Sequence, residues 1–241
     1  MKILTLNTWM EKGPWQKRWE VTFDSIDCLQ PDVIAFQEIF KPEWAKEVQT
    51  RTAYASLVHL PGSMKSGLCI LSKFTVLSFE EFELKAQSLN SEPKRFLLHA
   101  RLRSGVRDFS IFNTHLTWRL DEGDLRCRQV DEILEIIEKQ KNENVIVCGD
   151  FNAADNTEEL RKMITAGFKD TFKSVYPGST KLTWDNTNPY AASSSVRLPD
   201  RRIDFIFARG FEDPISSDIV LDKPNENGVF ASDHYGVLTE F

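Results

Sequence analysis

Long apolar segments and closely spaced cysteines are both missing from this chain of 241 residues. The longest apolar runs, such as residues 33–36 and 145–148, contain four or five residues, whereas a membrane-spanning helix needs about 20. No two of the four cysteines form a Cys-x-x-Cys pair, so a structural zinc site is not expected. The start of the chain also lacks a basic segment followed by an apolar one. We therefore expect no membrane span, no secretory signal, reduced thiols and a cytoplasmic location.

An excess of positive charge is missing as well. The chain has 30 lysines and arginines against 36 acidic residues, a net charge of −6. Sequence-independent binding of long nucleic acids depends on positive charge, so the composition argues against that class of protein. It leaves room for a small basic patch inside a cleft.

What the sequence does contain is short apolar strands that alternate with amphipathic helices. Trp19, Phe23, Ile26 and Leu29 recur at helical spacing, which predicts a helix with one buried face. Pro31 follows and would end it. Residues 42–52 favour a second helix, with a proline in its first turn.

The segment from residue 54 to residue 116 has a different pattern. It predicts an antiparallel meander with strands near residues 55–60, 67–72, 75–84, 95–103 and 108–115. A helix around residues 127–137, a strand at 144–149 and a helix that opens with a capping box at Asn156 and Glu159 follow. Residues 202–208 and 234–241 are predicted strands, and residues 186–200 are predicted to form a long surface loop. We expect an α/β fold of two mixed sheets with helices outside, in one domain that covers residues 1–241.

Polar side chains lie at the ends of six of these strands. Any one of them could be an ordinary loop residue, but six strands with such groups at their ends point to a common site. If the strand ends converge, one pocket would hold Asn7, Glu38, His115, Asp150, Asn152, Asp204, Asp233 and His234.

This set of side chains has a chemical logic. Carboxylate and amide oxygens are ligands for Mg²⁺ or Mn²⁺ rather than zinc. Two histidines can contact a phosphate and move protons near neutral pH. The sequence has no phosphate-binding P-loop, no glycine-rich dinucleotide turn and no evident serine or cysteine nucleophile. Hydrolysis of a phosphate ester by metal-activated water fits these residues best.

Seven segments of the chain also occur in a familiar order. They lie at residues 4–7, 31–38, 67–74, 113–116, 148–152, 202–206 and 232–236, and they include Gln-Glu, Asn-Thr-His, Gly-Asp-Phe-Asn and Ser-Asp-His. In this order the chain resembles the endonuclease/exonuclease/phosphatase superfamily, which has the deoxyribonuclease-I-like fold. The resemblance implies a four-layer α/β/β/α sandwich and metal-dependent cleavage of a phosphoester.

The resemblance also implies roles for individual residues. Glu38 would be the principal Mg²⁺ ligand, supported by Asn7, with Asp233 beside the metal as a ligand or through water. Asp150 would orient or deprotonate the attacking water. Asn152 and His115 would each hold a phosphate oxygen. His234 would contact the phosphate and stabilise the developing charge or pass a proton. Asp204 would bond the second nitrogen of His234 and fix its tautomer.

The substrate stays open at the level of sequence. Residues 182–185 and 201–209 are similar to tyrosyl-DNA phosphodiesterases, whereas aromatic residues near Asn7 and the Asn-Thr-His segment are similar to neutral sphingomyelinases. Trp184 could stack on a substrate or fill a gap in the core, and Arg197 and Arg202 could bind a phosphate or face solvent. The preferred substrate is a nucleic acid or a 5′-phosphotyrosyl adduct. The alternatives are a sphingomyelin-like lipid, an inositol or sugar phosphate, or a non-catalytic binding protein, and we expect a monomer.

Overall fold

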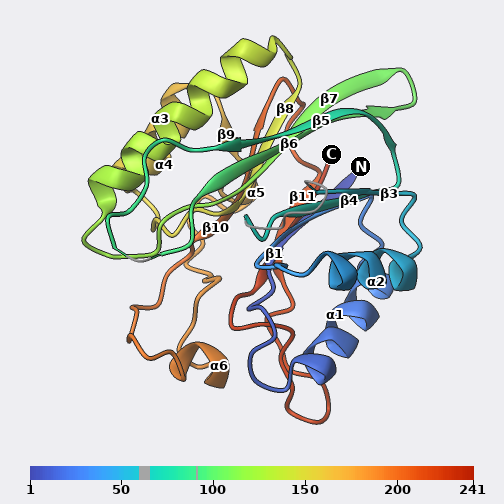
Figure 1. Ribbon diagram of the computed structural model, residues 1–241, viewed down its shortest axis with the longest axis vertical. Coiled ribbons are helices and arrows are strands. Elements are labelled where there is room, and N and C mark those ends of the chain that lie inside the picture. Colours follow the sequence, from blue (N-terminus) through green and yellow to red (C-terminus); the bar gives the residue numbers. More distant parts are fainter. Residues whose placement is uncertain (60–65, 91) are drawn as a thin grey trace.

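Two six-stranded sheets lie face to face in the computed structural model, which describes residues 1–59, 66–90 and 92–241. Helices cover the outer side of each sheet, so the chain forms four layers (Figure 1). The predicted α/β/β/α sandwich of two mixed sheets is therefore confirmed. Within the described ranges we find no helix that is both long and apolar enough to pass through a membrane.

The first sheet carries the N-terminal strand at its centre. In spatial order its strands are β11 (Ser216–Val220), β12 (Gly236–Glu240), β1 (Lys2–Asn7), β2 (Val33–Gln37), β4 (Cys69–Ser72) and β3 (Ser56–Val58). Strands β1 and β2 run parallel, and the other neighbours are antiparallel. Helices α1 (Trp15–Leu29) and α2 (Pro42–Thr52) lie on its outer side (Figure 1).

The second sheet has the same mixed character. Its strands, in spatial order, are β5 (Thr75–Glu83), β6 (Phe96–Ser104), β7 (Arg107–His115), β8 (Val145–Asp150), β10 (Asp204–Arg209) and β9 (Lys169–Asp170). Only β7 and β8 run parallel. The remaining helices are α3 (Gly123–Gln140), α4 (Glu158–Thr165), α5 (Thr171–Val175) and α6 (Pro189–Ala192), of which α3 and α4 cover this sheet (Figure 1).

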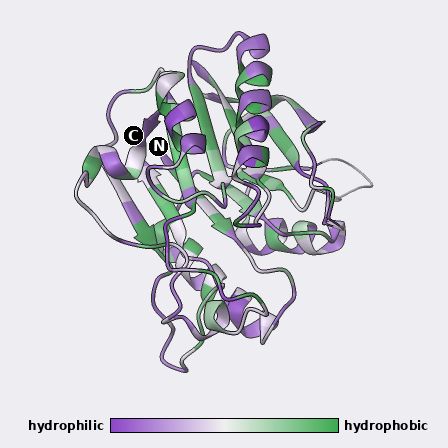
Figure 2. Ribbon diagram, turned by 90° about the vertical axis from the view of Figure 1, so that its left-hand side faces the viewer, coloured by the Kyte–Doolittle hydropathy of each residue, from purple (hydrophilic) through white to green (hydrophobic). Residues whose placement is uncertain are grey.

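Alternation along the strands builds three apolar layers. Successive side chains of a strand point to opposite faces. Ile3 therefore packs between the sheets while Leu4 packs under α1, and Ile146 faces the first sheet while Val147 packs under α3. Figure 2 shows apolar residues gathered along the strands and hydrophilic ones along helices and loops. Both faces of the central strands are buried, which explains their nearly continuous apolar sequences.

Two local predictions were wrong. The expected meander is split, because β3 and β4 pair within the first sheet, whereas β5, β6 and β7 form an antiparallel meander in the second. The chain changes sheets after Ser72, and the ring of Phe74 packs against Phe109 of β7. The capping box is also absent, since Thr157 is the N-cap of α4 without a side-chain bond, and Glu159 pairs with Arg126 instead.

The strand directions bring the predicted polar residues to one edge of both sheets. The parallel strands β1, β2, β7 and β8 end there, and the antiparallel strand β10 begins there with Asp204 opposite Asp150. A buried amide pair ties the sheets together beside this edge: Gln37 Nε2 donates to Asn113 Oδ1 over 2.7 Å, and Asn113 Nδ2 donates to the carbonyl of Phe36 over 2.8 Å. The site described below is therefore built across both sheets.

Candidate active site

One carboxylate oxygen, Oδ2 of Asp150, is the meeting point of side chains from both sheets. Asn7 Nδ2 at the end of β1 donates to it over 3.0 Å. His115 Nε2 at the end of β7 lies 3.4 Å away, and His234 Nε2 lies 3.8 Å away. The second oxygen, Oδ1, accepts the backbone N–H of Asn152 over 2.9 Å. The bond between Asn7 and Asp150 joins residues that are 143 positions apart in the sequence.

His234 is held from behind by a buried carboxylate. Its Nδ1 lies 2.9 Å from Asp204 Oδ2, so the ring is oriented with Nε2 toward Asp150. The backbone N–H of Asp204 bonds Thr183 Oγ1, and the Trp184 ring meets the His234 ring edge-on at 5.0 Å between centroids. Trp184 is buried, yet it also forms part of the cleft wall.

Glu38 and Asp233 lie on the first-sheet side of the same cleft. Glu38 follows β2 with a φ of 66°, and Asn152 on the other side has a φ of 50°. Non-glycine residues rarely adopt this left-handed conformation, and such strain is concentrated at functional sites. Asp233 is 6% exposed, and its Oδ1 accepts a hydrogen bond from Ser232.

The acids of the site repel one another. Burial, together with the negative charges of Asp233 and Asp150, raises the pKa of Glu38 to about 7. Burial likewise raises the pKa of Asp204 to about 6 and raises that of Asp233. Burial opposes ionisation of Asp150 too, yet His234, His115 and Asn7 hold its pKa below the usual range.

The two histidines differ in charge. Burial alone would lower the pKa of His234, but the flanking carboxylates of Asp204 and Asp150 raise it to about 10. Burial and the nearby Arg95 lower the pKa of His115 to about 3. At neutral pH the site therefore contains a protonated His234 and a neutral His115.

The donor set fits a hard divalent cation. Carboxylate and amide oxygens of Glu38, Asn7 and Asp233 suit Mg²⁺ or Mn²⁺, and burial and the neighbouring acids that raise the pKa of Glu38 leave it as a carboxylate that a cation would stabilise. The ligand atoms of Asp150, Asp204 and His234 also lie within 4.8 Å of one another. Because His234 Nδ1 is already bonded to Asp204, the cluster of Asp150, Asp204 and His234 is better suited to proton transfer than to metal binding.

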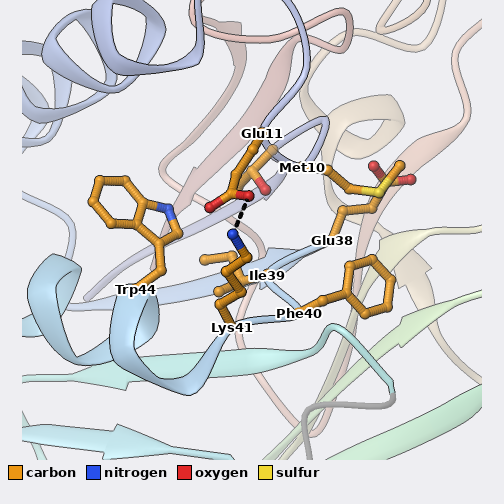
Figure 3. Close-up of a pocket in the computed structure, with 8 residues that line it drawn as sticks. Met10, Glu11, Glu38, Ile39, Phe40, Lys41 and Trp44 are labelled. Atoms are coloured by element: carbon orange, nitrogen blue, oxygen red, sulfur yellow. Dashed lines mark ion pairs between the residues drawn. The ribbon is translucent and has the colours of Figure 1, made fainter.

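Apart from Asp204, these residues line a cleft of about 760 Å³. Four aromatic side chains and two cations form its walls together with the polar residues: Trp9, Phe40, Trp118, Trp184, Lys12 and Arg95. A smaller pocket of about 120 Å³ shares Met10, Glu38 and Phe40 with the cleft. Figure 3 shows this pocket, in which Lys41 and Glu11 form an ion pair of 2.6 Å between Trp44 and Phe40.

The structure removes Arg202 from the predicted substrate-binding residues. Its guanidinium forms ion pairs of 2.5 Å with Asp155 and Asp170, and its side chain is 2% exposed. The neighbouring Arg201 lies near Asp150 instead. Burial lowers the pKa of Arg201, and the carboxylate of Asp150 acts in the opposite direction. Successive residues of an extended segment point to opposite sides, so a shift of one position decides which arginine approaches the site.

Other predicted residues lie where a substrate could reach them. Arg197 is exposed, and its neighbours Val196 and Leu198 line the cleft. Among the residues in the described ranges, Arg95 is a cleft residue that sequence reasoning missed. It is 7% exposed and its Nε has no hydrogen-bond partner. Its position just before an apolar strand gave no signal of this.

Comparison with known proteins finds relatives of similar sequence. Tyrosyl-DNA phosphodiesterase 2 of Mus musculus is 27% identical over 232 residues, which cover 88% of this chain and 58% of that protein. Sphingomyelinase C of Leptospira interrogans is 24% identical over 286 residues, which cover 98% of this chain and 51% of that protein. The chain thus spans little more than half the length of these curated relatives.

The fold has close matches among solved structures. D. rerio TDP2 complexed with a single-strand DNA product superposes with a TM-score of 0.79 at 19% identity, over 99% of this chain and 97% of that one. The family model described as Endonuclease/Exonuclease/phosphatase family matches residues 4–234. The order of the motifs, the four-layer fold and this match over nearly the whole length lead to one conclusion: the chain belongs to the Endonuclease/Exonuclease/phosphatase family.

Proposed function

We propose that this chain is a divalent-metal-dependent phosphodiesterase that hydrolyses a phosphoester by attack of water. The observation that carries the proposal is the convergence of Asn7, His115 and His234 on one oxygen of Asp150. Membership of the family supports the same reaction class. A single-domain organisation over residues 1–241, a monomeric state and a cytoplasmic location stay predictions from the sequence.

In this proposal Glu38, Asn7 and Asp233 hold Mg²⁺ or Mn²⁺. The ion, when bound, would supply positive charge that stabilises the charge developing on the phosphoryl oxygens. Asn7 Oδ1 accepts the backbone N–H of Trp9 over 3.1 Å and keeps a second lone pair for a cation. The positive charge of the ion would also reduce the repulsion between the carboxylates of Glu38 and Asp233.

The second-sheet side handles protons and binds the phosphate. Asp150, which is ionised before the reaction, orients the attacking water and accepts its proton as the new P–O bond forms. Protonated His234 gives its Nε2 proton to the leaving oxygen as the ester P–O bond breaks. Protonated His234 faces the phosphate through Nε2, and Asp204 holds its ring in place. Neutral His115 and the amide of Asn152 donate hydrogen bonds to phosphoryl oxygens.

For the substrate we favour a phosphodiester between tyrosine and DNA. Relatives named tyrosyl-DNA phosphodiesterase 2 support this choice. The cleft also offers aromatic walls at Trp118 and Trp184 and an under-paired cation at Arg95 for an aryl group and an anion. Arg197 on the adjoining loop is a further candidate contact for a phosphate.

A sphingomyelin-like diester is the second candidate. Trp9, Phe40, Trp118 and Trp184 line the cleft, and aromatic faces bind quaternary ammonium groups. The similarity to sphingomyelinase C points in the same direction.

Hydrolysis of bis-p-nitrophenyl phosphate tests the reaction class. We expect activity with Mg²⁺ or Mn²⁺, loss of activity with EDTA, and a fall in kcat of roughly 10²–10⁴-fold in Asp150→Asn. Asp213→Asn is the control, because this exposed aspartate pairs only with Lys169 among the described salt bridges. Activity of Asp150→Asn that survives EDTA would refute the mechanism. Absence of turnover with either ion would favour a binding protein.

A panel of substrates then separates the candidates. We expect an oligonucleotide with a 5′-phosphotyrosyl end to be cleaved with a higher kcat/KM than sphingomyelin in detergent micelles or an inositol phosphate. Faster cleavage of sphingomyelin would reverse the choice of substrate without changing the reaction class.

A further inference from the structure

One arginine of α1 joins the loop that follows Asn7, at residues 8–13, to the segment at residues 231–233, which contains Asp233. Arg18 is fully buried, with 0% exposure. Its five donor hydrogens all reach backbone carbonyls, which are those of Thr8 (2.9 Å), Trp9 (3.3 Å), Met10 (2.9 Å), Lys12 (3.0 Å) and Ala231 (3.0 Å). A guanidinium has five N–H donors, so none is left for a substrate.

The loop at residues 8–13 needs such support. Trp9 and Met10 have φ angles of 57° and 47°, a left-handed conformation that is unfavourable for non-glycine residues. The carbonyls of this loop turn toward Arg18, whose Cζ also lies 4.8 Å from the Trp9 ring centroid. Tyr190 stacks on the same ring at 5.1 Å between centroids. Arg18 thus stabilises a backbone shape that the loop alone would not favour.

Both loops lead directly to proposed ligands. Asn7 precedes the first loop, and Ala231 stands two positions before Asp233. Ser232 adds a second connection, because its Oγ donates to the carbonyl of Asn7 over 2.6 Å. The separation of Asn7 and Asp233 therefore depends on the Arg18 bonds and on this Ser232 bond.

The charge of Arg18 lies behind the acidic side of the site. Burial lowers the pKa of Arg18 to about 10, while Asp233 and Glu38 act in the opposite direction. The guanidinium stays protonated at neutral pH and faces these acids without being a residue of the cleft wall.

We propose that Arg18 is a positioning residue that clamps residues 8–12 to residues 231–233 and thereby prearranges Asn7 and Asp233 for the divalent ion. The identity of those ligands rests on the proposed function. The clamp itself rests on the five hydrogen bonds alone.

The variant Arg18→Lys tests the clamp, since it keeps the positive charge but cannot reach five carbonyls. Hydrogen–deuterium exchange should become at least 10-fold faster in peptides that cover residues 7–13 and 229–235. The Mg²⁺ dissociation constant, measured by calorimetry, should rise at least 10-fold. The control is Val130→Ala, which leaves a cavity under α3 at a fully buried position and touches neither loop.

Wild-type exchange rates in both peptides of Arg18→Lys would overturn the proposal. Equal loosening of these peptides in Val130→Ala at a matched melting temperature would also overturn it, because the effect would then be general destabilisation. If the wild type bound no Mg²⁺ while Arg18→Lys loosened both loops, the clamp would be supported and the proposed function would fail.

A second variant decides the case in which Arg18→Lys does not fold. Gly13 is exposed with a φ of +56°, and a Cβ there would lie 2.9 Å from the Trp9 ring. Gly13→Ala should disturb residues 8–12 and, through Arg18, residues 231–233. Loosening confined to the first loop would contradict the clamp.

Discussion

Two buried histidines of this chain have opposite pKa shifts because their neighbours differ. His234 lies between two carboxylates, which raise its pKa. His99 instead stacks on Phe112 at 4.3 Å between centroids and bonds Ser110 Oγ through Nε2 over 2.9 Å. Burial and Arg101 lower the pKa of His99 to about 4. The type of residue therefore does not fix its protonation state, and its surroundings do.

His99 should make the stability of the fold depend on pH. Between pH 6.5 and 4 the unfolded chain binds a proton that folded His99 excludes, so its contribution to stability is complete above pH 6.5 and is lost as the pH falls. We expect this histidine to reduce the free energy of unfolding by about 2 kcal/mol between pH 7 and pH 5. Urea unfolding of the wild type and His99→Gln at both pH values measures it. An identical pH dependence in the two proteins would disprove the assignment.

At the scale of elements, the close approach of β7 and β8 sets the spacing of His115 and Asp150. Thr114 stands opposite Gly149 in this parallel pair. Gly149 has a φ of +133°, and a Cβ there would lie 2.0 Å from the carbonyl oxygen of Thr114. A side chain at this position must push the two strands apart.

Gly149→Ala should therefore weaken both stability and activity. We expect a loss of about 3 kcal/mol or more, from strain added to overpacking, and a lower kcat because His115 and Asp150 separate. Thermal unfolding and diester hydrolysis measure the two effects. Gly178→Ala is the control, because Gly178 is exposed with no atom within 4 Å of its added Cβ. Equal behaviour of the two variants would contradict this account.

On the scale of the whole molecule, the buried acids of the site oppose folding of the metal-free chain. Glu38 is destabilised as an anion by burial and by Asp233 and Asp150. Glu38→Gln should therefore be more stable than the wild type without metal, by about 1–3 kcal/mol. Mg²⁺ at 1,000 times its dissociation constant should reverse the order, since it adds about 4.1 kcal/mol to a protein that binds it. Melting temperatures with and without Mg²⁺ check this, and equal metal-induced shifts in both proteins would count against Glu38 as a ligand.

Patterns local in the sequence predicted much of the fold. The spacing of Trp19, Phe23 and Ile26 predicted the buried face of α1, and the apolar runs predicted the central strands, because these features depend on neighbours within a turn or a strand. The chemical types at the strand ends, with Asp150 and His234 among them, pointed to a phosphoester site before any geometry was known. The segments 60–65 and 91, which include the end of one predicted strand, lie outside the described residues.

Long-range packing decided the rest. Nothing local distinguishes Arg202, which is enclosed by Asp155 and Asp170, from Arg201, which approaches the site. Arg18 looks like any polar residue of an amphipathic helix until its five carbonyl partners are seen. The change of sheet after β4 depends on strand pairings between distant segments. The sequence by itself determined the periodic elements and the chemistry available at their ends, whereas only the tertiary structure decided which of those groups meet, because contacts between distant residues depend on the packing of the whole chain.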